Sequence, residues 1–300
     1  MRVFLTGGTG YIGSAVLDAL LRAGHEVTAL IRGTANVGRL GSRGVTPVSG
    51  SLAEPERWRA AAAGFEAYVH AAFEMSPNGA ELDRRTVESL CGLAREGQAA
   101  LVYTSGIWVL GDTEGPADER TPLVPTAMAA FRPAVEETVL ACELDGVRPI
   151  VVRPGYVYGG GRGIISDLLK DAENGLMRII GAGENHWPAI YDRDLGDLYA
   201  RLVGNASAAG VYYATDEADE TQGEIVEAIA AQAPIRPDIR RMPLDEARRK
   251  MGPYADALSL DQVVRSPRAR ALGWQPTLKS VARNVPRLFE EWRNAHSERA

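Results

Sequence analysis

Short apolar runs alternate with longer amphipathic segments along the first half of the chain. The first run, Arg2–Thr6, is followed by Ile12–Ala23, in which apolar residues recur every three or four positions, as in a helix with one buried face. Strands that alternate with such helices predict βαβ units, a parallel sheet and a doubly wound α/β fold. The six strands expected here are Arg2–Thr6, Glu26–Ile31, Thr46–Val48, Ala67–His70, Ala100–Tyr103 and Pro149–Arg153.

The pattern changes after residue 153. Glycine and proline become dense between residues 154 and 163, and helix-like segments dominate from residue 224 onward. We therefore expect residues 1–157 and 195–232 to form the sheet domain. Residues 158–194 and 233–300 are expected to form a smaller, mostly helical lobe.

Composition excludes several classes of protein. Asp and Glu number 39 against 33 Lys and Arg, so the net charge is −6, which argues against a nucleic-acid or anionic-membrane coat. Two cysteines are too few for a disulfide framework, and the four histidines show no ligand spacing, so no metal site is expected. No run approaches roughly 18 apolar residues, and the apolar start is too short for a signal peptide. A cytoplasmic protein that binds neither nucleic acid nor membrane is expected.

A glycine-rich segment, Thr6-Gly-Gly-Thr-Gly-Tyr-Ile-Gly13, joins the first predicted strand to the first predicted helix. In this context Gly7 permits a tight turn, Gly10 lets the backbone approach a pyrophosphate, and Gly13 lets the helix pack on the strand. Free N–H groups at the helix start would then bind phosphate groups. The sheet domain is therefore predicted to bind a dinucleotide, and the smaller lobe to bind the substrate.

Arg32 stands at the end of the second predicted strand, where NAD-binding chains usually carry an acidic residue. A guanidinium group suits a 2′-phosphate instead. The sequence therefore predicts NADP(H) rather than NAD(H) as the cofactor, with Arg39 and Arg43 as further candidate ligands.

Several further segments resemble the short-chain dehydrogenase/reductase superfamily, in its extended or atypical, epimerase/dehydratase-like branch. Residues 48–52 are similar to that branch's "GDL" segment, with Ser51 in place of Asp, 68–72 to its "vHxAA" segment, and 153–159 to "RPxxVYG". Residues 181–195 and 266–276 also resemble family segments, so the resemblance covers nearly the whole chain. It implies a Rossmann fold, oxidoreductase activity and a cofactor bound by Gly7, Gly10, Tyr11, Ile12, Gly13, Arg32, Ser51, Leu52, Ala71, Ala72, Thr104, Arg132 and Pro154.

The catalytic set that the resemblance implies, a Ser or Thr with a Tyr-x-x-x-Lys, is absent from this sequence. Gly106 occupies the hydroxyl position, Met128 that of the tyrosine and Arg132 that of the lysine. Methionine has no transferable proton, and arginine stays protonated. Ser105 and Tyr156 are the first candidates among the protein groups that could help, and Tyr158 and His186 are further candidates.

Loss of the acid need not abolish carbonyl reduction, because positioning supplies much of the rate. A phenol beside the substrate's ketone ionises near the same pH as tyrosine and can replace it. The sequence also resembles antibiotic-tailoring ketoreductases that act on angucyclinones in simocyclinone-type biosynthesis, which implies a polycyclic aromatic polyketide substrate. A pocket for this flat ligand is expected from Phe73, Ser105, Gly106, Trp108, Met128, Tyr156, His186 and Trp187.

Two other functions stay open at this point. One is a non-catalytic NADP(H)-binding sensor or regulator. The other is a nucleotide-sugar epimerase or dehydratase, which is disfavoured because oxidation of a sugar hydroxyl needs a base on the enzyme. Family members often dimerise through helices equivalent to 82–94 and 127–142, and the faces of these segments leave both a monomer and a homodimer open.

Overall fold

The computed structural model describes residues 1–297. The chain divides into two compact units. The first comprises residues 1–105, 131–153 and 195–212, and the second comprises residues 106–130, 154–194 and those from 213 onward. Compared with the expected domains, segments 106–130, 154–157 and 213–232 fall in the second unit.

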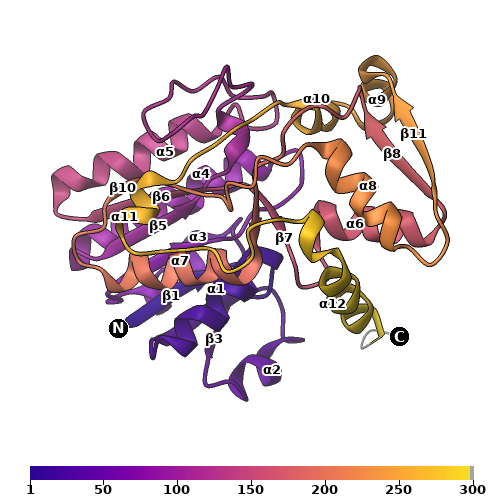
Figure 1. The fold of residues 1–300 in the computed structure, drawn as a ribbon. Coiled ribbons are helices and arrows are strands. Elements are labelled where there is room, and N and C mark those ends of the chain that lie inside the picture. The colour runs from indigo at the N-terminus through magenta and orange to yellow at the C-terminus, as the bar shows by residue number, and fades with distance from the viewer. Residues whose placement is uncertain (298–300) are drawn as a thin grey trace. The chain divides into compact units, whose positions relative to one another are not determined.

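A seven-stranded sheet forms the centre of the first unit, in the order β10-β6-β5-β4-β1-β2-β3, and Figure 1 labels β10, β6, β5, β1 and β3 of this sheet. The neighbours β1/β2, β1/β4, β2/β3, β4/β5 and β5/β6 are parallel, so the predicted doubly wound fold is confirmed. The strands are β1 (Arg2–Thr6), β2 (Glu26–Ile31), β3 (Thr46–Ser49), β4 (Ala67–His70), β5 (Ala100–Thr104), β6 (Arg148–Pro154) and β10 (Gly210–Ala214).

Helices cover both faces of this sheet, which explains why its central strands β1, β4 and β5 are almost completely buried. On one face, buried residues such as Phe4, Leu90 and Val139 form a single core beneath α3, α4 and α5. On the other face α7 packs on α1, where a Cβ at Gly196 would lie only 2.5 Å from the carbonyl oxygen of Ala15. The helices are α1 (Tyr11–Arg22), α2 (Val37–Gly41), α3 (Pro55–Trp58), α4 (Gly79–Gly97), α5 (Arg132–Ala141) and α7 (Asp192–Gly204), with 3₁₀ turns η1 (Ala60–Ala62) and η3 (Cys142–Asp145).

The second unit has a core of its own, built around Trp187 and Phe289. Two small parallel strand pairs, β7/β9 and β8/β11, support its helices. Its strands are β7 (Tyr156–Tyr158), β8 (Leu176–Ile180), β9 (Ala189–Tyr191) and β11 (Asp238–Met242). Its helices are α6 (Gly163–Glu173), α8 (Gln222–Gln232), α9 (Leu244–Met251), α10 (Tyr254–Ser259), α11 (Pro267–Ala271) and α12 (Val285–Ser297), with 3₁₀ turns η2 (Ile107–Val109) and η4 (Ala282–Asn284).

Asp194 lies within the first turn of α7 and does not cap this helix. Helix α7 begins at Asp192, and the Asp194 carboxylate accepts hydrogen bonds from the backbone N–H groups of Thr277 and Leu278 at 2.9 and 3.1 Å. The side chain therefore holds the segment before α12 rather than the start of α7.

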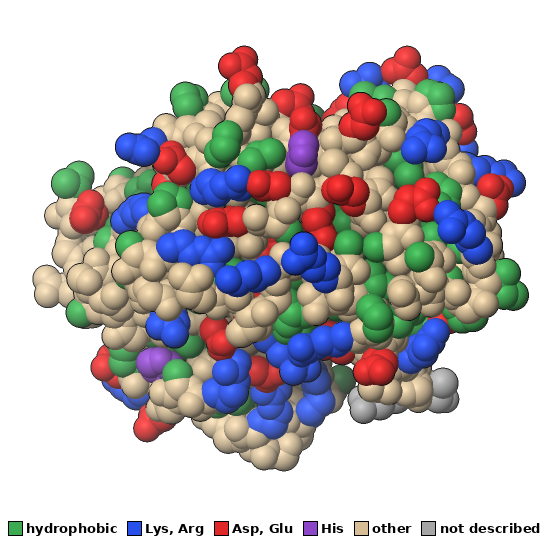
Figure 2. Space-filling model, viewed as in Figure 1, with side chains coloured by type: hydrophobic (Ala, Val, Ile, Leu, Met, Phe, Trp, Pro, Cys, Tyr) green, Lys and Arg blue, Asp and Glu red, His purple; other side chains and the backbone are tan. Residues whose placement is uncertain are grey.

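Acidic and basic side chains are interspersed over most of the face shown in Figure 2, in agreement with the nearly balanced composition. Among residues 1–297, no helix combines the length and the apolar character needed to cross a bilayer.

Candidate functional site

The glycine-rich turn lies between β1 and α1. Gly7 has a φ of +79°, and a Cβ there would lie 2.5 Å from the carbonyl oxygen of Ala71. A Cβ at Gly13 would lie 2.0 Å from the carbonyl oxygen of Gly7. Backbone atoms thus occupy the space that side chains would need, so only glycine fits. Gly10 stands at the N-cap of α1 and has no side chain to cap it, which leaves the first helical N–H groups for an anion.

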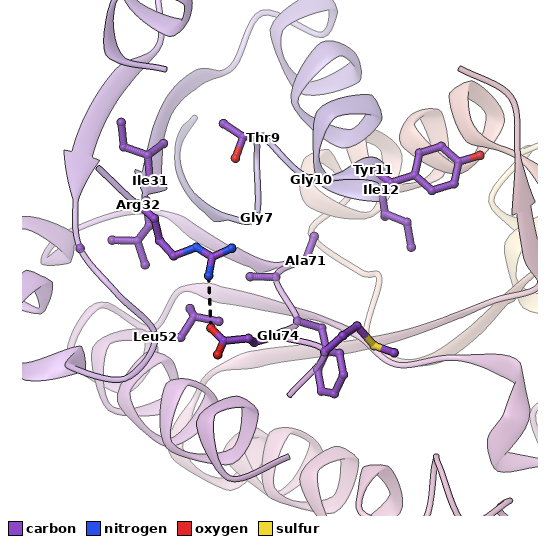
Figure 3. A pocket seen from close by; sticks show the side chains of 15 residues that line it. Gly7, Thr9, Gly10, Tyr11, Ile12, Ile31, Arg32, Leu52, Ala71 and Glu74 are labelled. Atoms are coloured by element: carbon purple, nitrogen blue, oxygen red, sulfur yellow. Dashed lines mark hydrogen bonds and ion pairs between the residues drawn. The ribbon is translucent and has the colours of Figure 1, made fainter. Parts of the chain in front are cut away.

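A cavity of about 570 Å³ opens beside this turn (Figure 3). Its lining comes from the turn itself, the end of β2, the segment after β3 and the segment after β4. Arg32 and Glu74 are the charged residues among those lining it, and Arg32 Nη1 lies 3.3 Å from Glu74 Oε2. The full lining is Gly7, Thr9, Gly10, Tyr11, Ile12, Leu30, Ile31, Arg32, Gly50, Leu52, Ala71, Ala72, Phe73, Glu74 and Met75.

The structure brings most of the predicted cofactor residues together at this cavity. Gly13 lies in the turn behind it, and Ser51 is engaged locally, where its hydroxyl accepts from the backbone N–H of Ala53 at 3.2 Å. Arg39 donates to the Asn36 side chain at 2.8 Å instead of lining the cavity. The predicted residues that line it are Gly7, Gly10, Tyr11, Ile12, Arg32, Leu52, Ala71 and Ala72, together with Phe73 from the predicted substrate pocket.

Glu74 and Met75 also line the cavity, and the sequence did not single them out. They lie in segment 71–78, which has neither helical nor strand periodicity, so no pattern indicated which way their side chains point. With a glycine turn, a helix N-terminus, apolar walls and one arginine, the cavity fits a dinucleotide. The role of each residue toward that cofactor stays a prediction.

A chain of buried polar contacts runs behind the turn, inside the first unit. Thr6 Oγ1 lies 2.6 Å from His70 Nδ1, and His70 Nε2 lies 3.2 Å from Asp83 Oδ1. The Tyr103 hydroxyl donates to the other oxygen of Asp83 at 2.7 Å. All four side chains are at most 2% exposed, and burial raises the pKa of Tyr103 well above its ordinary value.

Arg132 stands at the end of this chain of contacts. Its Nη1 donates to the Tyr103 hydroxyl and to the carbonyl oxygen of Thr104, both at 3.0 Å. Its guanidinium carbon lies 5.0 Å from the ring centroids of both Phe73 and Phe131, and these two rings stack at 5.6 Å. Arg132, which the resemblance predicts at the family's lysine position, is therefore held in place as a fixed cation.

The segment after β5 holds the predicted hydroxyl position. The Ser105 hydroxyl is buried and has no hydrogen-bond partner within residues 1–297, while its N–H donates to the carbonyl oxygen of Val152 at 2.8 Å. Gly106 is extended, with φ of −179°, and a Cβ there would meet nothing within 4 Å. The Thr104 hydroxyl pairs with Tyr199 at 2.7 Å.

Tyr156, the second candidate helper, is tied into the core of the second unit. Its hydroxyl donates to the carbonyl oxygen of Ala257 at 2.8 Å, and its ring stacks on Trp187 at 4.8 Å, with Trp108 edge-on at 6.0 Å. Burial raises its pKa. This geometry gives the hydroxyl a structural role and disfavours it as an acid.

The remaining predicted residues are distributed between the units. Phe73 and Ser105 belong to the first unit, whereas Gly106, Trp108, Met128, Tyr156, His186 and Trp187 belong to the second, as does Pro154. Met128 is half-buried in a turn. His186 Nδ1 lies 2.7 Å from Asp261 Oδ1, so a carboxylate orients this imidazole.

The chain is similar to several known proteins. The model of the NAD dependent epimerase/dehydratase family matches residues 3–213. An uncharacterised protein from Schizosaccharomyces pombe is 31% identical over 287 residues, covering 92% of this chain and 95% of that protein. A Stigmatella aurantiaca protein named 4-hydroxy-2-methyl-3-oxo-4-farnesyl-3,4-dihydroquinoline-1-oxide ketoreductase is 25% identical over 260 residues, covering 83% of this chain and 78% of its own length.

Among solved structures, the human epimerase family protein SDR39U1 with NADPH superimposes with a TM-score of 0.79 at 22% identity, over 97% of this chain and 99% of that one. This likeness supports the fold. The family model covers the glycine turn, the cavity and the sheet, and it ends within β10. With that span, and with a relative at 31% identity over nearly the full length, the chain belongs to the NAD-dependent epimerase/dehydratase family.

Proposed function

We propose that the chain is an NADPH-dependent ketoreductase that reduces a carbonyl group of a polycyclic aromatic, angucyclinone-like polyketide. The observation that carries this proposal is the presence of Met128 and Arg132 where the family has its Tyr and Lys, in a chain that keeps the glycine turn. A bound nicotinamide supplies the hydride. Because neither side chain releases a proton at neutral pH, a hydroxyl beside the substrate's carbonyl is the proposed source of the proton.

The chain's own residues would then bind the cofactor and position the substrate's carbonyl group. Arg32 supports a 2′-phosphate from the end of β2, since a guanidinium fork matches phosphate geometry. Arg132, fixed by Tyr103 and Thr104, supports the ribose hydroxyls as a permanent cation. Ser105, whose buried hydroxyl is unpartnered within residues 1–297, is the candidate to bind the carbonyl oxygen.

The Stigmatella aurantiaca relative supports the reaction class. Its name describes a ketoreductase for a 3,4-dihydroquinoline in which a 3-oxo group stands next to a 4-hydroxy group. Because C4 also carries the farnesyl group, this hydroxyl is a tertiary alcohol and not a phenol, so the relative supports reduction of a ring ketone and does not bear on the source of the proton.

The proposal is tested by incubating the protein with NADPH and a panel of polycyclic hydroxyquinones, following loss of the reduced-nicotinamide absorbance and formation of the alcohol. Methylation of the hydroxyl beside the reduced carbonyl should lower turnover by about a hundredfold or more, because general acid help typically contributes about 10²–10⁴ in rate. Unchanged turnover of the methyl ether would reject supply of the proton by the substrate. Binding of NADPH without turnover of any substrate would favour a sensor instead.

Two variants separate protein from substrate as the proton source. Tyr156→Phe should keep turnover within a few-fold, because its hydroxyl already bonds to Ala257. Ser105→Ala should cost about tenfold, the loss of one hydrogen bond to the carbonyl oxygen. A loss greater than about a hundredfold in either variant would assign the proton to the protein.

A further inference from the structure

The cavity beside the glycine turn contains an acidic side chain where a phosphate-binding site would be expected to hold only cations. Given the dinucleotide site of the proposed function, we propose that Glu74 sets the cofactor preference of this chain by opposing a 2′-phosphate at Arg32. The preference for NADPH over NADH is then smaller than Arg32 alone would produce.

The two side chains point toward one another across the cavity (Figure 3). Arg32 follows β2 and Glu74 lies in the segment after β4, so residues 42 positions apart in sequence meet at 3.3 Å. The side chains are 76% and 36% exposed. An exposed ion pair of this kind is weak, so an incoming phosphate can replace the Glu74 carboxylate as the partner of Arg32. The carboxylate then still lies close to the bound phosphate.

The backbone of Glu74 is held on both sides, which keeps its side chain at this wall of the cavity. On one side Phe73 is anchored by its stack on Phe131. On the other side the Ser76 N–H donates to the Glu74 carbonyl oxygen at 2.9 Å, and a Cβ at Gly79 would lie 2.1 Å from that same oxygen. Glu74 is therefore held between a fixed ring and the start of α4.

The net charge of the cavity lining determines how Glu74 affects the affinity for NADPH. Of the residues that line the cavity, Arg32 contributes +1 and Glu74 contributes −1, so the net charge of the lining is zero. Glu74→Gln leaves +1 facing a phosphate that carries close to two negative charges. At a separation of a few Å and a dielectric between surface and bulk values, this change should raise the affinity for NADPH about five- to twentyfold.

NADH should respond differently. Its ribose presents a 2′-hydroxyl, and a carboxylate accepts a hydrogen bond from a hydroxyl whereas it repels a phosphate. Glu74→Gln should therefore leave the affinity for NADH unchanged or lower it. The ratio of the two affinities rises in either case.

The experiment is a titration of the unchanged chain and of E74Q with NADPH and NADH, followed by nicotinamide fluorescence, so that no substrate or turnover is needed. Glu81 supplies the matched control, since it is an exposed acid paired with Arg84 on α4 outside the cavity lining. E81Q should leave both affinities within twofold. Repeating the titrations at roughly 0.5 M salt should shrink the gain in E74Q, because exposed charges are screened.

An increase of at least fivefold for NADPH, without an equal gain for NADH, supports the proposal. Equal gains for both cofactors, or no gain for NADPH, overturn it. These results leave the proposed function intact as long as the unchanged chain binds NADPH, whereas failure of the unchanged chain to bind either dinucleotide overturns the proposed function as well.

Discussion

The turn after β1 and the region from Thr104 to Arg132 follow the family pattern to different degrees. In the turn, every glycine of the motif is kept, because backbone atoms stand where a Cβ at Gly7 or Gly13 would lie. In the second region the usual hydroxyl, tyrosine and lysine positions hold Gly106, Met128 and Arg132. In the turn, steric exclusion permits glycine alone. At Gly106, by contrast, a Cβ would meet nothing within 4 Å, so packing does not dictate the residue type.

Arg132 shows what replaces the lost chemistry. Its charge is used in packing, since it bonds to Tyr103 and Thr104 and lies against two phenyl rings. The comparison teaches that this chain retains a turn with the geometry for holding a cofactor and, on the predicted alignment with the family, has a fixed cation in place of a titrating pair. The four predictions below test each side of this contrast.

The largest effect is expected from Gly13→Ala. Its Cβ would overlap the carbonyl oxygen of Gly7 at 2.0 Å, so the turn must open and the helix start must move. We expect NADPH affinity to fall by more than about a hundredfold and stability to fall by about 3 kcal/mol or more, because overpacking displaces the backbone. Gly38→Ala, whose Cβ would meet nothing within 4 Å in α2, is the control and should bind normally. If G13A bound NADPH with an affinity within threefold of the unchanged chain, the turn would not require glycine for steric reasons.

Tyr103→Phe tests the buried contacts that hold Arg132. Loss of the hydroxyl removes one hydrogen bond from Asp83 and one from Arg132. The free energy of unfolding in urea should fall by about 1–3 kcal/mol, because a buried charged group loses a partner. Tyr68→Phe, whose hydroxyl donates to the backbone carbonyl of Ala62, should cost less. Equal costs would indicate that the charged partners add nothing.

Asp216→Asn tests whether a buried carboxyl group of the protein could supply the proton. Asp216 is 3% exposed, and burial raises its pKa from 3.8 to about 7. The folded chain therefore holds this proton more tightly than the unfolded chain, so its contribution to stability is full below pH 3.8 and is lost as the pH rises to about 7. In D216N the fall in melting temperature between pH 5 and pH 8 should shrink by about a few °C.

The control for this variant is Asp197→Asn, which removes an exposed acid paired with Arg22. Turnover by D216N should stay within about threefold, since the Asp216 carboxylate is engaged by Tyr158 and by the N–H of Ala218. A loss of turnover beyond about a hundredfold would identify Asp216 as a proton source within the protein. The difference drawn between the turn and the catalytic positions would then be wrong.

Gly106→Ser should have the smallest effect. The backbone there is extended, and a Cβ meets nothing within 4 Å, so the melting temperature should change by no more than the equivalent of about 0.5 kcal/mol. Thermal unfolding monitored by circular dichroism measures this. A larger loss would mean that glycine is required here for steric reasons, as it is in the turn.

Much of the fold could be predicted because its signals lie in consecutive residues. Strand and helix periods placed β1, β2 and β4 at their observed residues, and β3, β5 and β6 close to theirs. The glycine spacing indicated the turn, and the arginine after β2 indicated a charged cavity wall. The Gly106, Met128 and Arg132 positions followed from the family resemblance, and no period or spacing would have shown them.

The amino-acid sequence by itself determined the doubly wound sheet, the turn in which only glycine fits, and the absence of a Tyr-x-x-x-Lys. Tertiary structure alone decided that Glu74 faces Arg32, that Tyr103 and Thr104 hold Arg132, and that Asp194 supports the segment before α12. The physical reason is the separation along the sequence of the residues involved. Local sterics and periodic burial are encoded within a few residues, whereas these polar contacts join residues far apart in the chain that meet only after the sheet and its helices have packed.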